Sequence, residues 1–103
     1  MFKQMRIGTL NLQGGNSESK KMNIIEDMYA YKMDALLITE TRISGNIMKE
    51  MATLDGKQKY KFYTSGLNKN TRYGVGIILP KDTNADFQRI TDRICKATIK
   101  RIN

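Results

Sequence analysis

A continuous apolar run at residues 35–39, Ala-Leu-Leu-Ile-Thr, constrains the fold of this chain more than any other feature. Such a run is typical of a strand that is covered on both faces. Residues 5–12 alternate between two faces and predict an earlier strand, and helically spaced apolar side chains predict a helix from about Glu18 to Lys32. The chain is therefore expected to begin with a strand–helix–strand unit.

The rest of the sequence predicts one more helix and three more strands. Apolar side chains at helical spacing predict a short helix that ends at Gly56. These side chains are Ile47, Met48, Met51 and Leu54. Residues 60–65 and 73–79 predict a hairpin with a long loop, and residues 93–102 alternate as a last strand. The pattern indicates a single domain of the α/β or α+β class, and since no turn signal follows the last strand, we expect residues 1–103 to be part of a larger domain.

The chain is basic and lacks histidine. Its 18 Lys and Arg against 10 Asp and Glu give a formal net charge of +8. This excess suits an anionic partner such as nucleic acid, and it also fits an ordinary solvated basic surface. Without histidine, any catalysis by these residues would depend on carboxylates and a hard metal ion.

The cysteine content and the hydropathy pattern indicate where the protein functions. The single cysteine, Cys95, cannot form an internal disulfide, which favours a reducing compartment. No apolar run approaches the roughly 20 residues of a membrane span, and the first residues lack the apolar core of a signal peptide. We therefore expect an intracellular protein, nuclear or cytoplasmic, that has no membrane partner.

Two polar residues stand at the ends of the first two predicted strands, Asn11 and Glu40. Ligand sites in α/β sheets gather outside the carboxyl ends of strands. A carboxylate beside a neutral amide suits Mg²⁺ that keeps most of its waters, with Mn²⁺ as a substitute. From the residues alone, the ordinary interpretation is a solvated strand-end acid and a turn-forming amide.

Three segments occur in a characteristic order: Ile-Gly-Thr-Leu-Asn-Leu-Gln-Gly at 7–14, Asp-Ala-Leu-Leu-Ile-Thr-Glu-Thr-Arg at 34–42 and Tyr-Gly-Val-Gly-Ile-Ile-Leu at 73–79. In order and spacing they resemble the opening of endonuclease/exonuclease/phosphatase domains, most closely the endonucleases of non-LTR retrotransposons. Residues 91–94, Thr-Asp-Arg-Ile, also match the start of a strand in that group. The resemblance implies the N-terminal portion of a four-layer α/β sandwich with mixed, largely antiparallel β-sheets.

The resemblance also implies roles for individual residues. Asn11 matches the asparagine that positions the scissile phosphate and the attacking water, and Glu40 matches the glutamate that ligates Mg²⁺. Arg42 matches a basic residue beside that glutamate. Arg72 and Tyr73 match a loop that contacts the nucleic-acid backbone, although an ordinary exposed hairpin loop fits them equally well.

Two positions depart from the family pattern. Thr39 stands where a glutamine usually precedes the glutamate, and Gln13 stands where DNA-repair members often carry an aspartate. The second departure argues against the abasic-site repair branch. The family's active-site tyrosine and its Asp-x-Asn and Asp-His pairs belong to later strands, which this sequence does not include.

We therefore predict the N-terminal part of a Mg²⁺-dependent endonuclease that hydrolyses DNA phosphodiester bonds and is inactive on its own. Two alternatives remain open. One is a non-catalytic basic module that binds nucleic acid or another protein, and the other is a phosphatase branch of the same superfamily. Unpaired sheet edges would also permit copies of the chain to associate.

Overall fold

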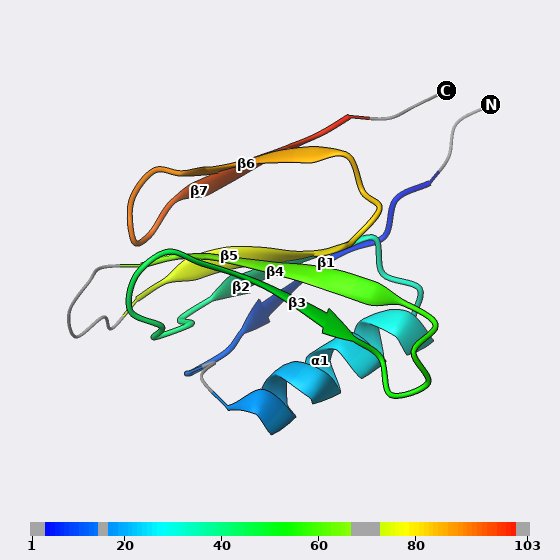
Figure 1. Ribbon diagram of the computed structural model, residues 1–103. Helices are drawn as coiled ribbons and strands as arrows, with labels where there is room; N and C mark the ends of the chain where they lie inside the picture. The colour runs from blue at the N-terminus through cyan, green and yellow to red at the C-terminus, as the bar shows by residue number, and fades with distance from the viewer. Residues whose placement is uncertain (1–3, 15–16, 67–72, 101–103) are drawn as a thin grey trace.

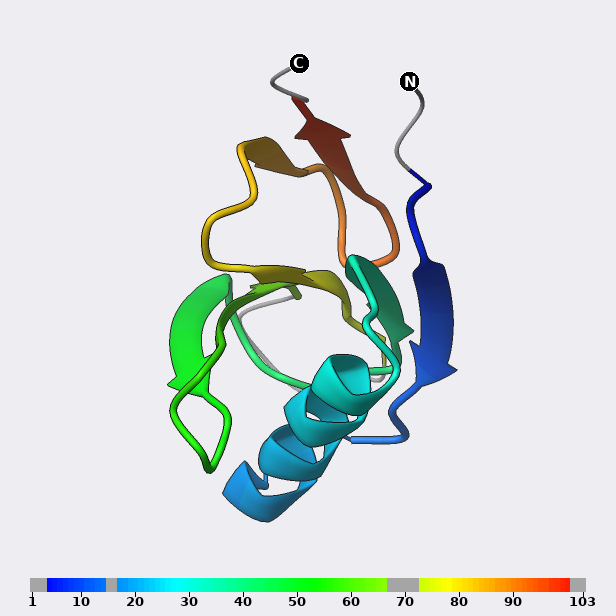
Figure 2. The same ribbon diagram turned by 90° about the vertical axis from the view of Figure 1, so that its right-hand side faces the viewer.

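A computed structural model describes residues 4–14, 17–66 and 73–100, which form one helix and seven strands. They lie in three layers: helix α1, a five-stranded sheet and a two-stranded sheet (Figures 1 and 2). In chain order the elements are β1 (Ile7–Asn11), α1 (Glu18–Ala30), β2 (Ala35–Thr39), β3 (Ile47–Ala52), β4 (Lys59–Ser65), β5 (Val75–Pro80), β6 (Ala85–Arg89) and β7 (Cys95–Ile99). The described part of the chain is therefore an α+β structure built mostly from strands.

The predicted strand–helix–strand unit is confirmed. Strands β1 and β2 pair in parallel, so that Ile7 lies opposite Ala35 and Asn11 lies opposite Thr39. Between them, α1 begins after Ser17, whose hydroxyl accepts the backbone N–H of Lys20 at 3.3 Å and caps the helix. The helix ends at Ala30, slightly before the predicted boundary.

The five-stranded sheet has the order β1-β2-β5-β4-β3. Only the β1–β2 pair is parallel, and β5 joins β2, β4 joins β5 and β3 joins β4 in antiparallel pairs. The predicted hairpin is thus confirmed as β4–β5, and residues 67–72 of its loop lie outside the described residues. Because β5 is antiparallel to β2, the first residue of β5, Val75, lies opposite Thr39 at the end of β2.

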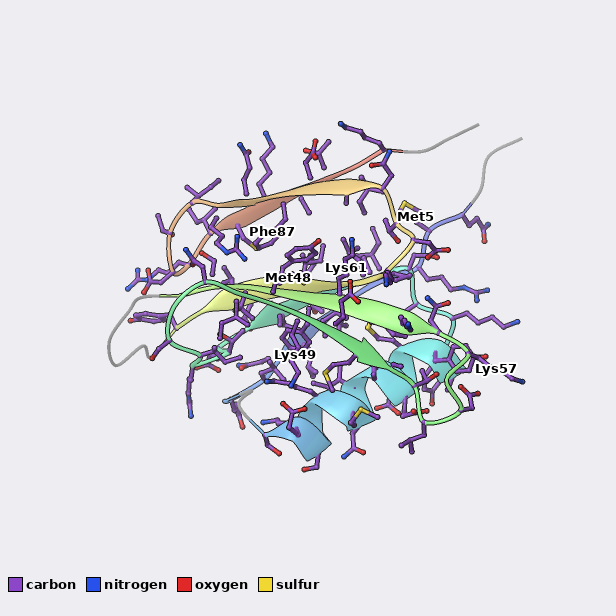
Figure 3. The ribbon with its side chains drawn as sticks, in the orientation of Figure 1. Met5, Met48, Lys49, Lys57, Lys61 and Phe87 are labelled. Atoms are coloured by element: carbon purple, nitrogen blue, oxygen red, sulfur yellow. The ribbon has the colours of Figure 1, made fainter. Side chains whose placement is uncertain are left out.

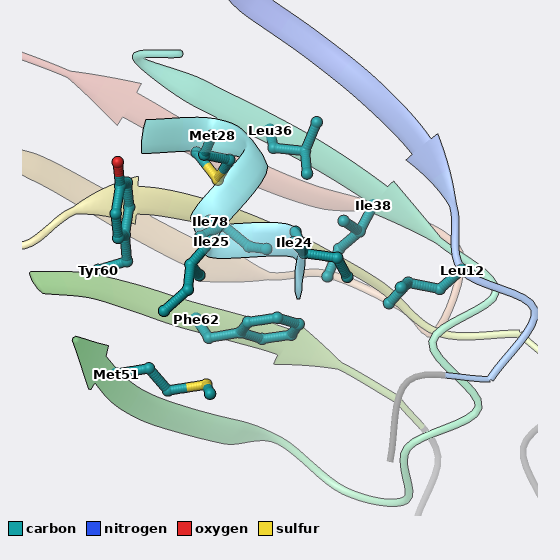
Figure 4. Close-up of a cluster of buried hydrophobic side chains, with 10 residues drawn as sticks. All are labelled: Leu12, Ile24, Ile25, Met28, Leu36, Ile38, Met51, Tyr60, Phe62 and Ile78. Atoms are coloured by element: carbon teal, nitrogen blue, oxygen red, sulfur yellow. The ribbon is translucent and has the colours of Figure 1, made fainter. Parts of the chain in front are cut away.

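Helix α1 covers one face of this sheet and forms the main core. Ile24, Ile25 and Met28 recur at helical spacing and are buried against the sheet. Their partners come from four strands and from the residue after β1, and they enclose a continuous apolar cluster (Figure 4). The buried members are Leu12, Ile24, Ile25, Met28, Leu36, Ile38, Met51, Tyr60, Phe62 and Ile78. Burying side chains of this size contributes about 1.5–3 kcal/mol each.

The hairpin β6–β7 covers part of the opposite face. Phe87 points from β6 toward the middle layer (Figure 3) and stacks on Tyr63 of β4, with ring centroids 4.9 Å apart. Ala97 and Ile99 of β7 pack with Phe87 around buried residues of β2 and β5. The cover is incomplete, because Ile7 and Leu37 on this face of β1 and β2 remain 56% and 42% exposed. The prediction that residues 35–39 are covered on both faces is therefore wrong at Leu37.

The predicted second helix is wrong, since residues 47–52 form strand β3. Its residues pair with β4, which places Met51 opposite Tyr60 in the main core. The apolar side chains that suggested a helical stripe do not share one buried face, because Met48 is 52% and Leu54 84% exposed. Gly56 therefore ends no helix. It lies in the turn between β3 and β4 with a φ of +73°.

The last two strands, β6 and β7, form the second sheet. The last strand is confirmed as β7, whereas its partner β6 had no counterpart among the predicted elements. The four-layer arrangement implied by the resemblance stays a prediction, because the described residues form three layers. No helix within these residues is long and apolar enough to cross a membrane.

Candidate functional site

The ends of β1 and β2 continue side by side beyond the last paired residues. The backbone N–H of Leu12 donates to the carbonyl of Thr39, and that of Gly14 donates to the carbonyl of Glu40, both at 2.8 Å. Asn11 and Glu40 therefore stand on adjacent chain segments at the same sheet end, as the sequence predicts. Asn11 is exposed, and its side-chain oxygen accepts the backbone N–H of Gln13 at 3.3 Å.

The segment after β2 is fastened to the segment before β5. The backbone N–H groups of Thr41 and Arg42 donate to the carbonyls of Gly74 and Tyr73 at 3.1 and 2.9 Å. Thr41 is fully buried, and a Cβ built on Gly74 would lie 2.1 Å from its hydroxyl oxygen. Glycine is thus required at position 74 for Tyr73 and Arg42 to come this close.

Helix α1 contributes a hydrogen-bond donor to the same sheet end. The Lys20 ammonium donates to the carbonyl of Gly14 at 2.7 Å and also to the carbonyl of Leu12. These carbonyls belong to the segment that follows Asn11. The first turn of α1 therefore fixes the backbone beside Asn11 through a charged donor, which makes stronger hydrogen bonds than a neutral one.

Left-handed backbone conformations concentrate at this sheet end. Among the described non-glycine residues with positive φ, three lie here: Gln13 at +51°, Glu40 at +49° and Arg42 at +52°. The remaining one, Lys32, follows α1. Such conformations cost free energy and persist where surrounding contacts impose them, and they cluster at ligand sites. Glu40 and Arg42 turn the chain on either side of Thr41, and Gln13 turns it after β1.

Glu40 and Arg42 form an exposed ion pair. The Arg42 guanidinium nitrogen lies 3.9 Å from a Glu40 carboxylate oxygen, and the side chains are 49% and 37% exposed. An exposed pair at this distance contributes about 0–1 kcal/mol. Either partner can therefore turn toward an incoming ligand at little cost, the arginine toward an anion and the carboxylate toward a cation.

Arg93 joins these residues from the other sheet, and the sequence-based assignment missed it. Its guanidinium carbon lies 4.2 Å from the ring centroid of Tyr73. The β6–β7 turn that carries it is tied to the middle layer, because the backbone N–H of Gly74 donates to the carbonyl of Asp92 at 2.9 Å. Arg93 lies within the Thr-Asp-Arg-Ile segment noted above, yet that match indicated only the start of a strand.

We call Asn11, Glu40, Arg42, Tyr73 and Arg93 the strand-end site. The start of β5, the end of β2 and the β6–β7 turn lie toward the left-hand end of Figure 1. The structure thus brings four of the five predicted site residues to one end of the molecule. The fifth, Arg72, lies outside the described residues.

Two side chains at this sheet end are of types that can ligate magnesium. Glu40 offers a carboxylate and Asn11 an amide oxygen, which are ligand types that Mg²⁺ accepts while keeping several waters. Within residues 4–14, 17–66 and 73–100, no three acidic or thiol side chains gather as a fuller metal site. Among the five residues described above at this sheet end, Glu40 is the one that carries a carboxylate.

Comparison of the chain with known protein families, with curated proteins and with solved structures found no match.

Proposed function

We propose that this chain carries a phosphate- and metal-binding part of a Mg²⁺-dependent endonuclease that acts on DNA phosphodiester bonds. One observation carries the proposal. Asn11 and Glu40, chosen from strand ends and from the family resemblance, stand on adjacent segments at one sheet end. Arg42 and Tyr73, chosen from the same resemblance, are hydrogen-bonded to each other through their backbones there.

Each residue of the site has a distinct role in this proposal. Glu40 holds Mg²⁺, with Mn²⁺ as a substitute, and Asn11 orients the phosphate or a water through its amide. Arg42 leaves its weak pairing with Glu40 to contact a phosphate oxygen. Bound Mg²⁺ would supply charge stabilisation and a more acidic water. Arg72 and Tyr73 contact the nucleic-acid backbone.

The small number of catalytic groups limits the activity that the chain can have by itself. The sequence has no histidine, and the described part of the site offers a single carboxylate. Loss of a general base alone typically lowers a rate by about 10²–10⁴. We therefore propose that the chain binds nucleic acid and does not cleave it without further groups.

The place of β6–β7 on the face opposite α1 is compatible with the four-layer sandwich of the family that the sequence resembles.

A second candidate function is binding without any chemistry. The single carboxylate and the formal net charge of +8 favour it, since a basic surface binds phosphates without a metal. The phosphatase branch of the superfamily would instead act on small phosphate esters. Metal binding at Glu40 separates the nuclease proposal from a binding-only module.

The decisive experiment is a Mg²⁺ and Mn²⁺ titration followed by amide NMR. We expect residues 11–14 and 40–42 to shift first, at the millimolar concentrations of a weak site, and Glu40→Gln to abolish the shifts. Asp82 and Asp86, exposed carboxylates near and on β6, serve as the internal control. Shifts confined to these two residues would refute the metal assignment and leave the binding-only module.

A plasmid-nicking assay tests the cleavage part. Supercoiled plasmid incubated with Mg²⁺ and the chain should remain intact over hours, with Glu40→Gln as the matched comparison. Nicking that Glu40→Gln removes would show that the chain already holds a complete active site, contrary to the proposal.

A further inference from the structure

The turn between β6 and β7 is a braced structure rather than a loose connection. The hydroxyl oxygen of Thr91 accepts the backbone N–H groups of Arg93 and Ile94, each at 3.0 Å. The carbonyl of Thr91 accepts the hydroxyl of Ser65 at 2.8 Å, which ties the turn to the end of β4. With the bond from Gly74 to Asp92, the turn is fastened to the middle layer at two points.

These hydrogen bonds hold Arg93 next to the aromatic ring of Tyr73. The guanidinium lies over the Tyr73 ring at 4.2 Å, and Tyr73 accepts the Arg42 N–H through its backbone carbonyl. Tyr73 therefore has one arginine over its ring and another hydrogen-bonded to its backbone. Arg93 is exposed, and among the ion pairs formed by the described residues none involves it.

The position of Arg93 over the Tyr73 ring influences which of its atoms remain available to a ligand. A guanidinium that lies flat on a ring uses its face for the aromatic contact and keeps its N–H edges for acceptors. Those edges suit the oxygens of a phosphate, which arginine can bind in a bidentate manner. Because the side chain is already held by the ring, less conformational freedom is lost on binding.

We propose that Arg93, supported by Tyr73, is a second phosphate-contacting arginine of the strand-end site, and that the site's ligand is a polynucleotide strand rather than a small phosphate ester. The inference rests on the proposed function and narrows it. Arg42 contacts the phosphate beside Glu40, and Arg93 contacts another phosphate of the same backbone. Arg42 follows a strand of the five-stranded sheet and Arg93 lies in the β6–β7 turn, so the two arginines approach the ligand from different layers. A polynucleotide backbone, which presents phosphates at regular intervals, suits this arrangement better than an ester with a single phosphate.

The test compares nucleic-acid affinity for single-site variants at several salt concentrations. Arg93→Ala should weaken binding of a short DNA duplex several-fold and reduce the slope of log affinity against log salt by about one unit. Lys57→Ala removes the same charge from the β3–β4 turn and serves as the matched control. We expect it to change affinity much less, because Lys57 lies at the end of the molecule opposite the β6–β7 turn and the start of β5 (Figures 1 and 3).

Variants of the pair test the stacking itself. Tyr73→Leu should lose part of the Arg93 contribution, whereas Tyr73→Phe should keep it, since the ring and not the hydroxyl provides the support. Arg93→Lys should give an intermediate affinity, because an ammonium keeps the charge without the planar contact. An amide NMR spectrum of each variant verifies that the β6–β7 turn stays folded.

Different ligands separate the two proposals. Binding of a mononucleotide should weaken with Arg42→Ala and stay unchanged with Arg93→Ala, whereas both substitutions should weaken binding of duplex and single-stranded DNA. If Arg93→Ala matches Lys57→Ala while Arg42→Ala weakens binding, the inference fails and the proposed function stands. If Arg42→Ala and Arg93→Ala both match Lys57→Ala, the strand-end site is not the nucleic-acid site.

Discussion

At the scale of single residues, Gly74 is the position on which the strand-end site most depends. Its φ of +101° is costly for any other residue, and an added Cβ would overlap the Thr41 hydroxyl. We expect Gly74→Ala to destabilise the fold by about 1–2 kcal/mol for the backbone and by about 1–3 kcal/mol more for the overlap. Urea unfolding measures the change in the free energy of unfolding.

Gly56 provides the matched control for this prediction. Its φ is also positive, at +73°, and an added Cβ would meet no atom within 4 Å. Gly56→Ala should therefore show only the backbone cost. Equal destabilisation by the two substitutions would contradict the steric role assigned to Gly74.

The half-buried Cys95 predicts a pH dependence of stability. Burial raises the pKa of its thiol, because the thiolate is disfavoured away from water. The contribution of the neutral thiol to folding is thus fully present below the unfolded-state pKa of about 8.5 and is lost as pH rises through the folded-state pKa. Urea unfolding at a series of alkaline pH values should show a steeper loss of stability than in Cys95→Ser. Parallel curves would contradict the assignment.

At the scale of elements, β3 gives a direct test of strand against helix. In a helix, Met48 and Met51 would share a face, whereas in β3 they point to opposite sides, with Met48 52% and Met51 8% exposed. Met51→Ala should cost about 2–5 kcal/mol and Met48→Ala no more than about 0.5 kcal/mol. Similar costs in thermal or urea unfolding would favour the helix that the sequence suggested.

Phe87 provides the largest apolar contact between the β6–β7 hairpin and the middle sheet. Phe87 stacks on Tyr63 and is the one large aromatic side chain of the hairpin. Because Phe87 is only partly buried, Phe87→Ala should cost no more than about 3 kcal/mol, the lower end of the range for core phenylalanines. Phe87→Leu, which retains apolar volume, serves as a milder control. Hydrogen exchange should accelerate in β6 and β7 before it does in β2, β4 and β5. Uniform acceleration in both sheets would show that the hairpin does not open independently.

Local sequence patterns predicted some of these elements and not others. The strand–helix–strand unit and the β4–β5 hairpin were predicted because their periodicities are local and unambiguous. Residues 47–52 were wrongly predicted as a helix, because the apolar residues at 47, 48 and 51 have helical spacing. Their pairing with β4 depends on contacts that are distant in sequence. Strand β6 was missed because Phe87 is its one large apolar residue.

Some residues of the strand-end site could likewise be placed from sequence, and others could not. Asn11 and Glu40 could be placed from sequence, because Asn11 ends one strand and Glu40 follows another, and both strand ends are visible in the pattern. Arg93 could not, because its contact with Tyr73 requires the register of a separate hairpin and the attachment of its turn to the main sheet. The positions of residues within one layer were predictable, whereas the approach of a residue from the second layer was not.

At the scale of the whole molecule, net charge predicts how binding responds to salt. A formal charge of +8 offers many phosphate contacts, and each contact releases counterions, with a slope of about 0.9 per phosphate on duplex DNA. Affinity for DNA and RNA of unrelated sequence should therefore fall linearly on a log–log plot against salt. Affinity that does not change with salt would contradict an interface based on phosphate contacts.

The incomplete cover of the middle sheet also concerns the whole molecule. Ile7 and Leu37 form an exposed apolar area on β1 and β2, beside the hairpin that shields β4 and β5. Among the described strands, β1 and β3 end the large sheet and have no further neighbour. Association of copies through sheet edges stays a prediction, which sedimentation over a range of protein concentrations would test.

The division of the strand-end site over both sheets has a consequence for the order of folding. The β3–β4 and β6–β7 hairpins join near neighbours in sequence and can form within microseconds. The pairing of β2 with β5 must close a much longer loop, and the hairpin turn can bond to Gly74 only after β5 is in place. Affinity for phosphate should therefore develop last during refolding, so that collapsed intermediates with most of their strands formed would not yet compete for nucleic acid.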